Sequence, residues 1–294
     1  MLLEKIPKVN IKNYIILKLA NDKLDEAQDN LLIKIHQREI DGIVISDFLS
    51  KLEIKSIKEN IKSIPEESKF EIHGCGGFLY PITFNQLRKD DNYQEHKYRY
   101  FKEADIFSSK FSQNFKFNIE LKLSNLFSKL SLNKKVIVAP GICSGSKMLP
   151  VTIRVFQPGR GGAFPHCHNT YDEDLHPEFV NHFSGLMKMK HQLSFFISVN
   201  KPEKGGELTL LNIEHRDANR KQSDFDILKS DGSVFDTTIE ENKNKIQLDE
   251  GDLIIFAGGD IWHQVEDIEG AKNRVTIGGF GTFSLDNSIF YIWS

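Results

Sequence analysis

The chain after Leu132 constrains the fold most, because it consists of short strand-like runs separated by turn residues. These runs fall at 135–139, 150–157, 191–199, 206–213, 252–257, 261–266, 273–280 and 288–293. The turns between them include Pro140-Gly141, Pro158-Gly159, Lys204-Gly205-Gly206, Glu250-Gly251-Asp252 and Gly258-Gly259. Many short strands with glycine turns and little intervening helix are typical of two packed antiparallel sheets. This part of the sequence therefore predicts a jelly roll.

The first 134 residues have a mixed pattern with more helix. Apolar spacing predicts helices over 23–38 and from Tyr98 to about Leu130. Between them we expect a strand at 42–45, a helix capped by Ser46, Asp47 or Ser50 and ended by Pro65, and strands at 69–72 and 77–80. The predicted fold is mainly β with N-terminal helices. Residues 1–134 would support a core formed by residues 135–294, within one continuous domain.

The charge, apolar runs and cysteines of the chain limit the partners and the compartment that we expect for it. The 294 residues carry a formal net charge of -3, with scattered lysines and no basic stripe, so we expect no nucleic-acid partner. The apolar runs are too short to cross a bilayer, and Met1-Leu2-Leu3-Glu4-Lys5 does not resemble a secretory signal. Three cysteines without paired spacing favour a reducing compartment. We expect a cytoplasmic protein without a membrane partner, and a homo-oligomer is compatible with the sequence.

Two histidines follow a glycine-rich turn, in the order Pro158-Gly159-Arg160-Gly161-Gly162-Ala163-Phe164-Pro165-His166-Cys167-His168. Side chains of an extended chain alternate between faces, so His166 and His168 share one face and Cys167 points away. Two imidazoles on one face provide half of a metal site. The remaining ligand must come from another part of the chain.

A second stretch provides candidates for the rest of the site. A buried strand, Gly251 to Phe256, leads through a turn to His263 at the start of the next strand. In a jelly roll, strands that are distant in sequence converge, so His263 can complete a set with His166 and His168. Arg274 and Thr276 follow on one face of a neighbouring strand. A guanidinium beside a hydroxyl is a fitting clamp for a small carboxylate.

The order of these motifs resembles the iron(II)/2-oxoglutarate-dependent oxygenases, in particular the prolyl-hydroxylase-like branch that includes free amino acid hydroxylases and halogenases. The family's motifs match here Pro158-Gly159, His166-Cys167-His168, Gly205-Gly206-Glu207-Leu208, Gly251 to Phe256, His263 and Arg274-Val275-Thr276. The opening Ile45-Ser46-Asp47-Phe48-Leu49-Ser50 is also similar to that of the family. The resemblance implies a double-stranded β-helix that uses iron(II), dioxygen and 2-oxoglutarate. It also implies that Arg274 and Thr276 bind the oxo acid.

The sequence departs from this family at one ligand. His168 occupies the position where the family has a carboxylate. Halogenating relatives have a small residue there, which leaves room for chloride, so a histidine argues against halogenation. Three interpretations remain open. His166, His168 and His263 form an all-histidine site; or Asp172, Glu173 or Asp174 supplies a carboxylate in place of His168; or the site has lost its iron chemistry and retains only a binding role.

The sequence favours an iron(II) dioxygenase that acts on a small polar substrate such as an amino acid or a derivative. Asn169, Tyr171, Gln192 and Trp262 are candidates for contacting this substrate. Two polar segments, 169–189 and 214–247, interrupt the strand pattern and are predicted to be lids or surface loops. The alternatives are an all-histidine iron oxygenase that does not use 2-oxoglutarate, and a non-catalytic jelly-roll binding protein.

Overall fold

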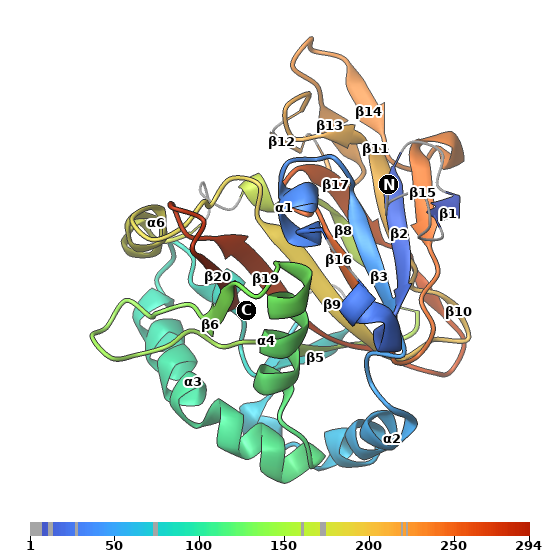
Figure 1. The fold of residues 1–294 in the computed structure, drawn as a ribbon. Coiled ribbons are helices and arrows are strands. Elements are labelled where there is room, and N and C mark those ends of the chain that lie inside the picture. The colour runs from blue at the N-terminus through green and yellow to red at the C-terminus, as the bar shows by residue number, and fades with distance from the viewer. Residues whose placement is uncertain are drawn as a thin grey trace.

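The computed structural model describes residues 8–10, 14–26, 29–72, 76–159, 162–170, 175–218, 220–221 and 223–294. Within this part of the chain, two sheets dominate the fold (Figure 1): a large, mainly antiparallel sheet in which β2–β3 and β6–β20 are parallel pairs, and a smaller antiparallel sheet. The predicted class, mainly β with N-terminal helices and a jelly-roll core, is confirmed. None of the described helices is both long and apolar enough to cross a membrane.

The larger sheet has eleven strands among the described residues. Their order along the sheet is β1 (Lys8–Asn10), β2 (Ile15–Ala20), β3 (Gly42–Ser46), β16 (Leu253–Phe256), β9 (Leu193–Asn200), β19 (Arg274–Phe283), β7 (Thr152–Phe156), β5 (Gly77–Tyr80) and β4 (Phe70–Glu71), while β20 (Ile289–Trp293) pairs with β19 and with β6 (Lys135–Val138). Strands from the N-terminal 134 residues thus extend both ends of the sheet. The division at residue 134 stays a prediction.

The smaller sheet carries the region of the histidines. Its order is β15 (Lys243–Ile246), β11 (Leu208–Glu214), β17 (Ile261–Val265) and β8 (Ala163–His166). The strands β10 (Lys204–Gly205) and β18 (Ile268–Glu269) form a separate two-stranded antiparallel sheet. A three-stranded sheet of β12 (Arg220–Lys221), β13 (Asp226–Leu228) and β14 (Val234–Asp236) projects from the body (Figure 1).

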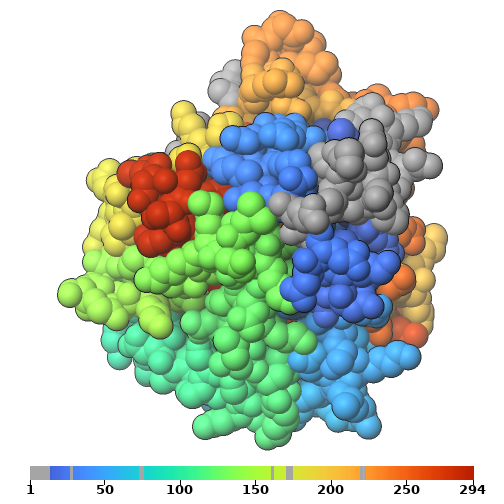
Figure 2. Space-filling model, viewed as in Figure 1, coloured from blue at the N-terminus to red at the C-terminus, as the bar shows by residue number. Residues whose placement is uncertain are grey.

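Helices pack on the larger sheet and at its edges. They are α1 (Leu31–His36), α2 (Lys51–Asn60), α3 (Tyr93–Phe115), α4 (Ile119–Leu130) and α6 (Pro177–Ser184). In α4, the buried Phe127 makes ring contacts with Phe195 of β9 and Phe290 of β20. Figure 2 shows α2, α3 and α4 forming the lower surface in this view. The helices therefore support the sheet that forms one wall of the site.

Two predicted helices are corrected by the structure. The helix expected over 23–38 divides into a 3-10 turn, Asn21–Glu26, and α1, which begins where the Asn30 side chain accepts a hydrogen bond from the Ile33 amide. The long helix expected to Leu130 divides at Lys116, which adopts a left-handed conformation with φ of 66°. Both helices of that pair bury apolar residues in one core, so the apolar period continues across the break.

The capped helix after β3 is α2, and Ser50 is its N-cap. The Ser50 hydroxyl accepts from the Glu53 amide while the Glu53 carboxylate accepts from the Ser50 amide, which forms a capping box. This helix ends at Asn60 and a 3-10 turn follows before Pro65. The prediction of a capped second helix was therefore right, and its end lies earlier than Pro65.

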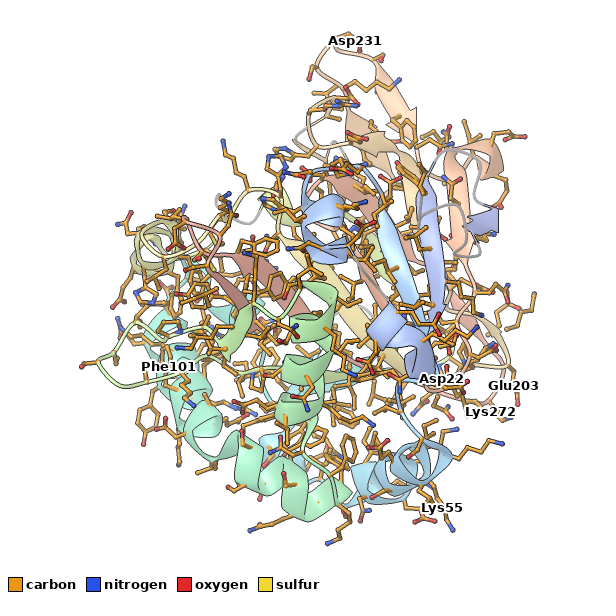
Figure 3. All side chains as sticks on the ribbon, viewed as in Figure 1. Asp22, Lys55, Phe101, Glu203, Asp231 and Lys272 are labelled. Atoms are coloured by element: carbon orange, nitrogen blue, oxygen red, sulfur yellow. The ribbon has the colours of Figure 1, made fainter. Side chains whose placement is uncertain are left out.

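The segment 214–247 is more ordered than a polar loop. It contains β12, β13, β14 and β15. Ile227 and Phe235 are buried in a small apolar cluster together with Trp262. These two apolar residues anchor the hairpin within a segment that is mostly polar in sequence, which explains why composition alone did not predict the strands. Figure 3 labels Asp231 at the tip of the β13–β14 hairpin, at the far end of the molecule from Lys55 on α2.

Candidate metal centre

The three predicted histidine ligands converge between the two sheets. His263 on β17 lies directly opposite His166 on β8 in the antiparallel register. His168 follows β8 at the start of a 3-10 turn, His168–Thr170. The ring centroids lie 4.3 Å apart for His166 and His263, 4.8 Å for His168 and His263, and 5.2 Å for His166 and His168. One nitrogen from each ring lies within 4.8 Å of the others.

Hydrogen bonds orient all three rings. Nδ1 of His166 lies 2.7 Å from the Phe164 carbonyl oxygen, and Nδ1 of His263 lies 2.8 Å from that of Ile261. A carbonyl only accepts, so each Nδ1 carries the proton and Nε2 carries the lone pair of the neutral ring. Nδ1 of His168 lies 2.6 Å from Ser194 Oγ. Such partners on the second ring nitrogen are a regular feature of histidines that bind metals.

The electrostatic environment keeps the imidazoles neutral. Burial, together with the smaller effects of the Lys221 and Arg154 charges, lowers the pKa of His166 to about 4, although the hydrogen bond to the Phe164 carbonyl acts in the opposite direction. Burial also holds the pKa values of His168 and His263 well below the usual range, and neighbouring imidazoles add to the shift. Neutral imidazole is the form that binds a metal. Three neutral, convergent nitrogens therefore fit a divalent iron with open positions for other ligands.

His168 is held by the backbone as well as by Ser194. Its amide donates to the Gly258 carbonyl over 3.0 Å, and its own carbonyl accepts from Gln192 Nε2 over 2.9 Å. A Cβ atom at Gly258 would lie 2.0 Å from Ser194 Oγ and 3.2 Å from His168 Nδ1. Glycine is required at this position because any side chain would displace the hydroxyl that orients the ring.

A cavity of about 150 Å³ contains the three histidines. The smaller sheet contributes His166 and His263, and the larger sheet contributes Ser194, Arg274 and Thr276. The aromatic residues that complete its wall are Phe156, Phe195, Phe196, Phe256 and Phe280. The site thus lies between the two sheets. Arg274 and Thr276 form its polar floor, and the five phenylalanines form its aromatic wall.

Arg274 and Thr276, which the sequence suggested as a clamp for a carboxylate, both line this cavity. Arg274 is buried, and its Nε donates to the Gly206 carbonyl over 2.7 Å. Its guanidinium carbon lies 5.2 Å from the centroid of the Phe196 ring. Burial lowers the pKa of Arg274 to about 10 and the charge of Arg154 adds to this shift, against the charge of Glu207, so the guanidinium remains protonated at neutral pH. A buried, oriented cation of this kind suits a carboxylate ligand.

The four candidate substrate contacts lie elsewhere or outside the described residues. Asn169 donates to Asp260, and Trp262 is buried in the small apolar cluster, where Nε1 donates to the Ala218 carbonyl. Gln192 holds the His168 backbone. Among the described residues, none of these three lines the cavity. Trp262 precedes His263 on one strand, so strand alternation places it on the opposite face. Tyr171 falls outside the described residues.

The carboxylates Asp172, Glu173 and Asp174, which provided the alternative ligand, also lie outside the described residues. Cys167 points away from the centre, as strand alternation predicts. It is buried in the same cluster as Trp262, and burial raises the pKa of its thiol to about 12. This thiol is therefore protonated and is not a ligand of the three-histidine set.

Sequence reasoning did not assign roles to Arg154, Ser194 and Gly258. Arg154 lies directly opposite Thr276 in the β7–β19 register and lines the cavity. The period-two rule placed Arg154 and Phe156 on one face of their strand, which was the signal available. Ser194 and Gly258 had no such signal, because their role depends on contacts between distant strands.

These features define an enzyme fold that carries a mononuclear metal centre between two sheets, as in the 2-oxoglutarate-dependent oxygenases. Residues 13–294 match the family model described as carrier-protein-independent halogenase WelO5. The chain belongs to this family. The comparison with curated proteins found no match.

Two solved structures of an N-substituted L-amino acid dioxygenase from Burkholderia ambifaria AMMD share the fold. One of them is a complex with alpha-KG. Each has a TM-score of 0.54 and covers 90% of this chain and 90% of that chain, and the identities are 15% and 17%. The predicted resemblance to this oxygenase superfamily and the prediction of an enzyme are confirmed by the family match.

The close approach at Gly258 gives a test of how the His168 ring is held. Replacing Gly258 by alanine should displace Ser194 Oγ and weaken iron(II) affinity roughly 10- to 100-fold, the usual effect of disturbing a partner of a metal-binding histidine. The matched control is Gly185→Ala, because a Cβ there comes no nearer than 3.5 Å to other atoms. Competition with a metal chelator measures both affinities. Equal iron affinity in the two variants would contradict this role.

The support of Arg274 by Gly206 gives a second prediction. Gly206 has φ of 72°, and a Cβ there would lie 3.1 Å from Arg274 Cδ and 2.9 Å from Pro202 Cγ. Gly206→Ala should move the guanidinium and weaken 2-oxoglutarate binding about tenfold or more, since a hydrogen bond to a charged group contributes about 1.5–3 kcal/mol. Calorimetric titration of the iron-loaded protein measures the affinity.

The control for that change is Gly232→Ala. Gly232 also has a positive φ, 83°, but a Cβ there meets no other atom within 4 Å. It therefore reproduces the backbone strain without the contact to Arg274. If both variants weaken 2-oxoglutarate binding equally, strain and not the displaced arginine is responsible.

Proposed function

We propose that this protein is a mononuclear iron(II) and 2-oxoglutarate-dependent oxygenase that hydroxylates or otherwise oxidises a small polar molecule, such as an amino acid or a derivative. The observation that carries the proposal is the convergence of three neutral histidines with a buried arginine in one cavity. Iron(II), the oxo acid and dioxygen together supply the oxidising chemistry of this class. The protein would act in the cytoplasm.

In this proposal the metal ligands are His166, His168 and His263. Each imidazole has its second nitrogen fixed by a neighbouring oxygen, so the three rings are oriented before the metal binds. Arg274 and Thr276 bind the far carboxylate of 2-oxoglutarate. The aromatic wall excludes water around them, which strengthens the attraction between the guanidinium and the carboxylate.

Hydroxylation is favoured over halogenation by the residue at position 168. The family description names halogenases, and chloride needs room beside the metal where His168 stands. The His168 ring is 5% exposed and contacts the Phe280 ring at a centroid distance of 4.6 Å. Its hydrogen bonds to Ser194 and the Gly258 backbone oppose a swing out of the cavity.

The activity test uses protein purified and loaded with iron(II) without oxygen. We expect binding of about one iron per chain, and production of succinate from 2-oxoglutarate when dioxygen and a suitable small molecule are present. Measurement of iron content and of succinate checks this. A chain that takes up no iron(II), and yields no succinate with any substrate tried, contradicts the proposal. Substrate-dependent consumption of dioxygen excludes a purely binding role.

The ligand set is tested separately by X-ray absorption at the iron edge. Three imidazoles should give multiple-scattering features of three histidines in the wild type and two in His168→Ala. An unchanged histidine count would indicate that His168 is not a ligand. This result would instead favour a carboxylate from Asp172, Glu173 or Asp174, without overturning the use of iron.

An all-histidine oxygenase that does not use 2-oxoglutarate is the second candidate, and the three-imidazole set favours it. Replacing Arg274 by glutamine separates the two functions. Loss of oxo-acid affinity by tenfold or more supports the 2-oxoglutarate-dependent reaction, because the charge-assisted contact is removed. Unchanged activity with no oxo-acid requirement would support the second candidate.

A further inference from the structure

A second hollow, which we call the outer groove, lies on the face of the larger sheet that points away from the histidines. Its volume is about 620 Å³, and Val155 on β7 and Val275 on β19 line it. The metal cavity is instead lined by the residues on either side of these two in sequence, which are Arg154, Phe156, Arg274 and Thr276. Side chains alternate between the faces of a strand, so the sheet itself separates the groove from the metal cavity.

The floor of the outer groove is a row of side chains across neighbouring strands. Phe78 on β5 lies opposite Val155, and Val155 lies opposite Val275. Asn200 on β9 lies opposite Val275 and continues the row. Residues that are directly opposite share one face and contact each other, so the three apolar side chains form a continuous surface. Ile61, in the 3-10 turn after α2, adds a further apolar side chain. This floor suits the apolar body of a ligand.

The walls of the groove carry positive charge. Four lysines line it, and among the described residues no aspartate or glutamate does; the lysines are Lys58, Lys62, Lys69 and Lys272. Lys58 and Lys62 come from the end of α2 and the turn after it, and Lys272 comes from the loop before β19. In Figure 3, Lys272 lies above α2, on which Lys55 is labelled. The helix and the loop thus bring lysines to the groove from two separate parts of the chain.

Two of the four lysines are held by carboxylates that do not line the groove. Lys58 Nζ lies 2.7 Å from each carboxylate oxygen of Glu250. Lys69 Nζ lies 2.6 Å from Glu66 Oε2 and 4.8 Å from the centroid of the Phe78 ring. These contacts fix the two ammonium groups at the border of the apolar floor. The charge of each is offset by its partner, so neither is the main anion contact.

The other two lysines, Lys62 and Lys272, are exposed and form no ion pair with any residue that the structure describes. Glu203 lies beside the loop of Lys272, where it accepts a hydrogen bond from the Ala271 amide over 3.0 Å. It lines the cavity on the Arg274 side of this loop and not the outer groove. An ammonium group has three donors, so Lys62 and Lys272 can both bind an incoming anion.

We propose that the outer groove binds a small amphiphilic anion, in which one anionic group is attached to an apolar body. Lys62 and Lys272 bind the anionic group. The apolar body lies along the row of Phe78, Val155 and Val275. The volume of the groove falls within the range of small-molecule sites, about 300–1,000 Å³, and this hollow shape favours a small molecule over a flat protein surface. The proposal is independent of the iron chemistry of the other face.

The test uses two fluorescent probes that share an apolar body and differ by one charge. Anilinonaphthalene sulfonate carries a sulfonate, and phenylnaphthylamine is the same molecule without it. Fluorescence titration measures both affinities without oxygen, in the presence of iron(II) and 2-oxoglutarate, which compete for the metal cavity. The wild type should bind the sulfonate about fivefold or more tightly than the neutral probe, as expected for two exposed charge contacts. Added salt should reduce this preference, because it screens exposed charges.

Paired variants locate the site. The double variant Lys62→Gln with Lys272→Gln should lose the preference for the sulfonate and bind the neutral probe as the wild type does. The control, Lys55→Gln with Lys110→Gln, removes the same two charges from exposed positions outside the groove. It should keep the preference. All four lysines are exposed, so these changes leave the core intact.

Three results would overturn the assignment. A wild type that binds both probes equally has no anion site in the groove. A control pair that loses the preference as fully as the groove pair shows only an effect of net charge. If Arg274→Gln weakens the sulfonate as strongly as the groove pair does, the probe binds in the metal cavity. A chain that shows the predicted preference but binds no 2-oxoglutarate contradicts only the proposed function and supports this inference.

Discussion

The antiparallel pairing of β8 with β17 is the interaction on which the centre depends. It places His263 opposite His166 across two neighbouring strands, almost one hundred residues apart in sequence. A shift of this pairing by one residue would turn one imidazole to the far face, because strand side chains alternate. On that far face lie Trp262 and Cys167, whose burial in a separate apolar cluster opposes such a shift. The packing of Trp262 and Cys167 on the far face therefore fixes the positions of His166 and His263 on the face toward the cavity.

His168 is positioned by different means, because β8 ends at His166. Its backbone is tied to Gly258 and Gln192, and its ring to Ser194 on the opposite sheet. The position of the His168 ring therefore depends on the spacing between the two sheets. Since α4 supports the back of the larger sheet through Phe127, the N-terminal helices contribute to this spacing although they lie far from the cavity.

Strand periodicity and motif order predicted much of the site and fold. They gave the jelly roll, the convergence of the three histidines, and Arg274 beside Thr276 on one face. They did not predict the break at Lys116, since the apolar period continues through it. The strands within 214–247 were missed because most residues of this segment are polar, and Ile227 and Phe235 are buried against residues distant in sequence. The roles of Ser194 and Gly258 arise from contacts across sheets, which no local pattern encodes. Trp262 was a candidate by proximity in sequence, although alternation turns it away.

The replacement of a carboxylate by His168 changes the electrostatics of the whole cavity and not only the ligand count. A carboxylate ligand would offset part of the charge of a bound metal, whereas a neutral imidazole offsets none of it. With an imidazole there, the same fold has a stronger attraction for anions. The substitution would thus raise the charge of the metal-loaded centre by one unit, while the hydrogen bonds of His168 to Ser194, Gly258 and Gln192 keep its ring in the ligand position.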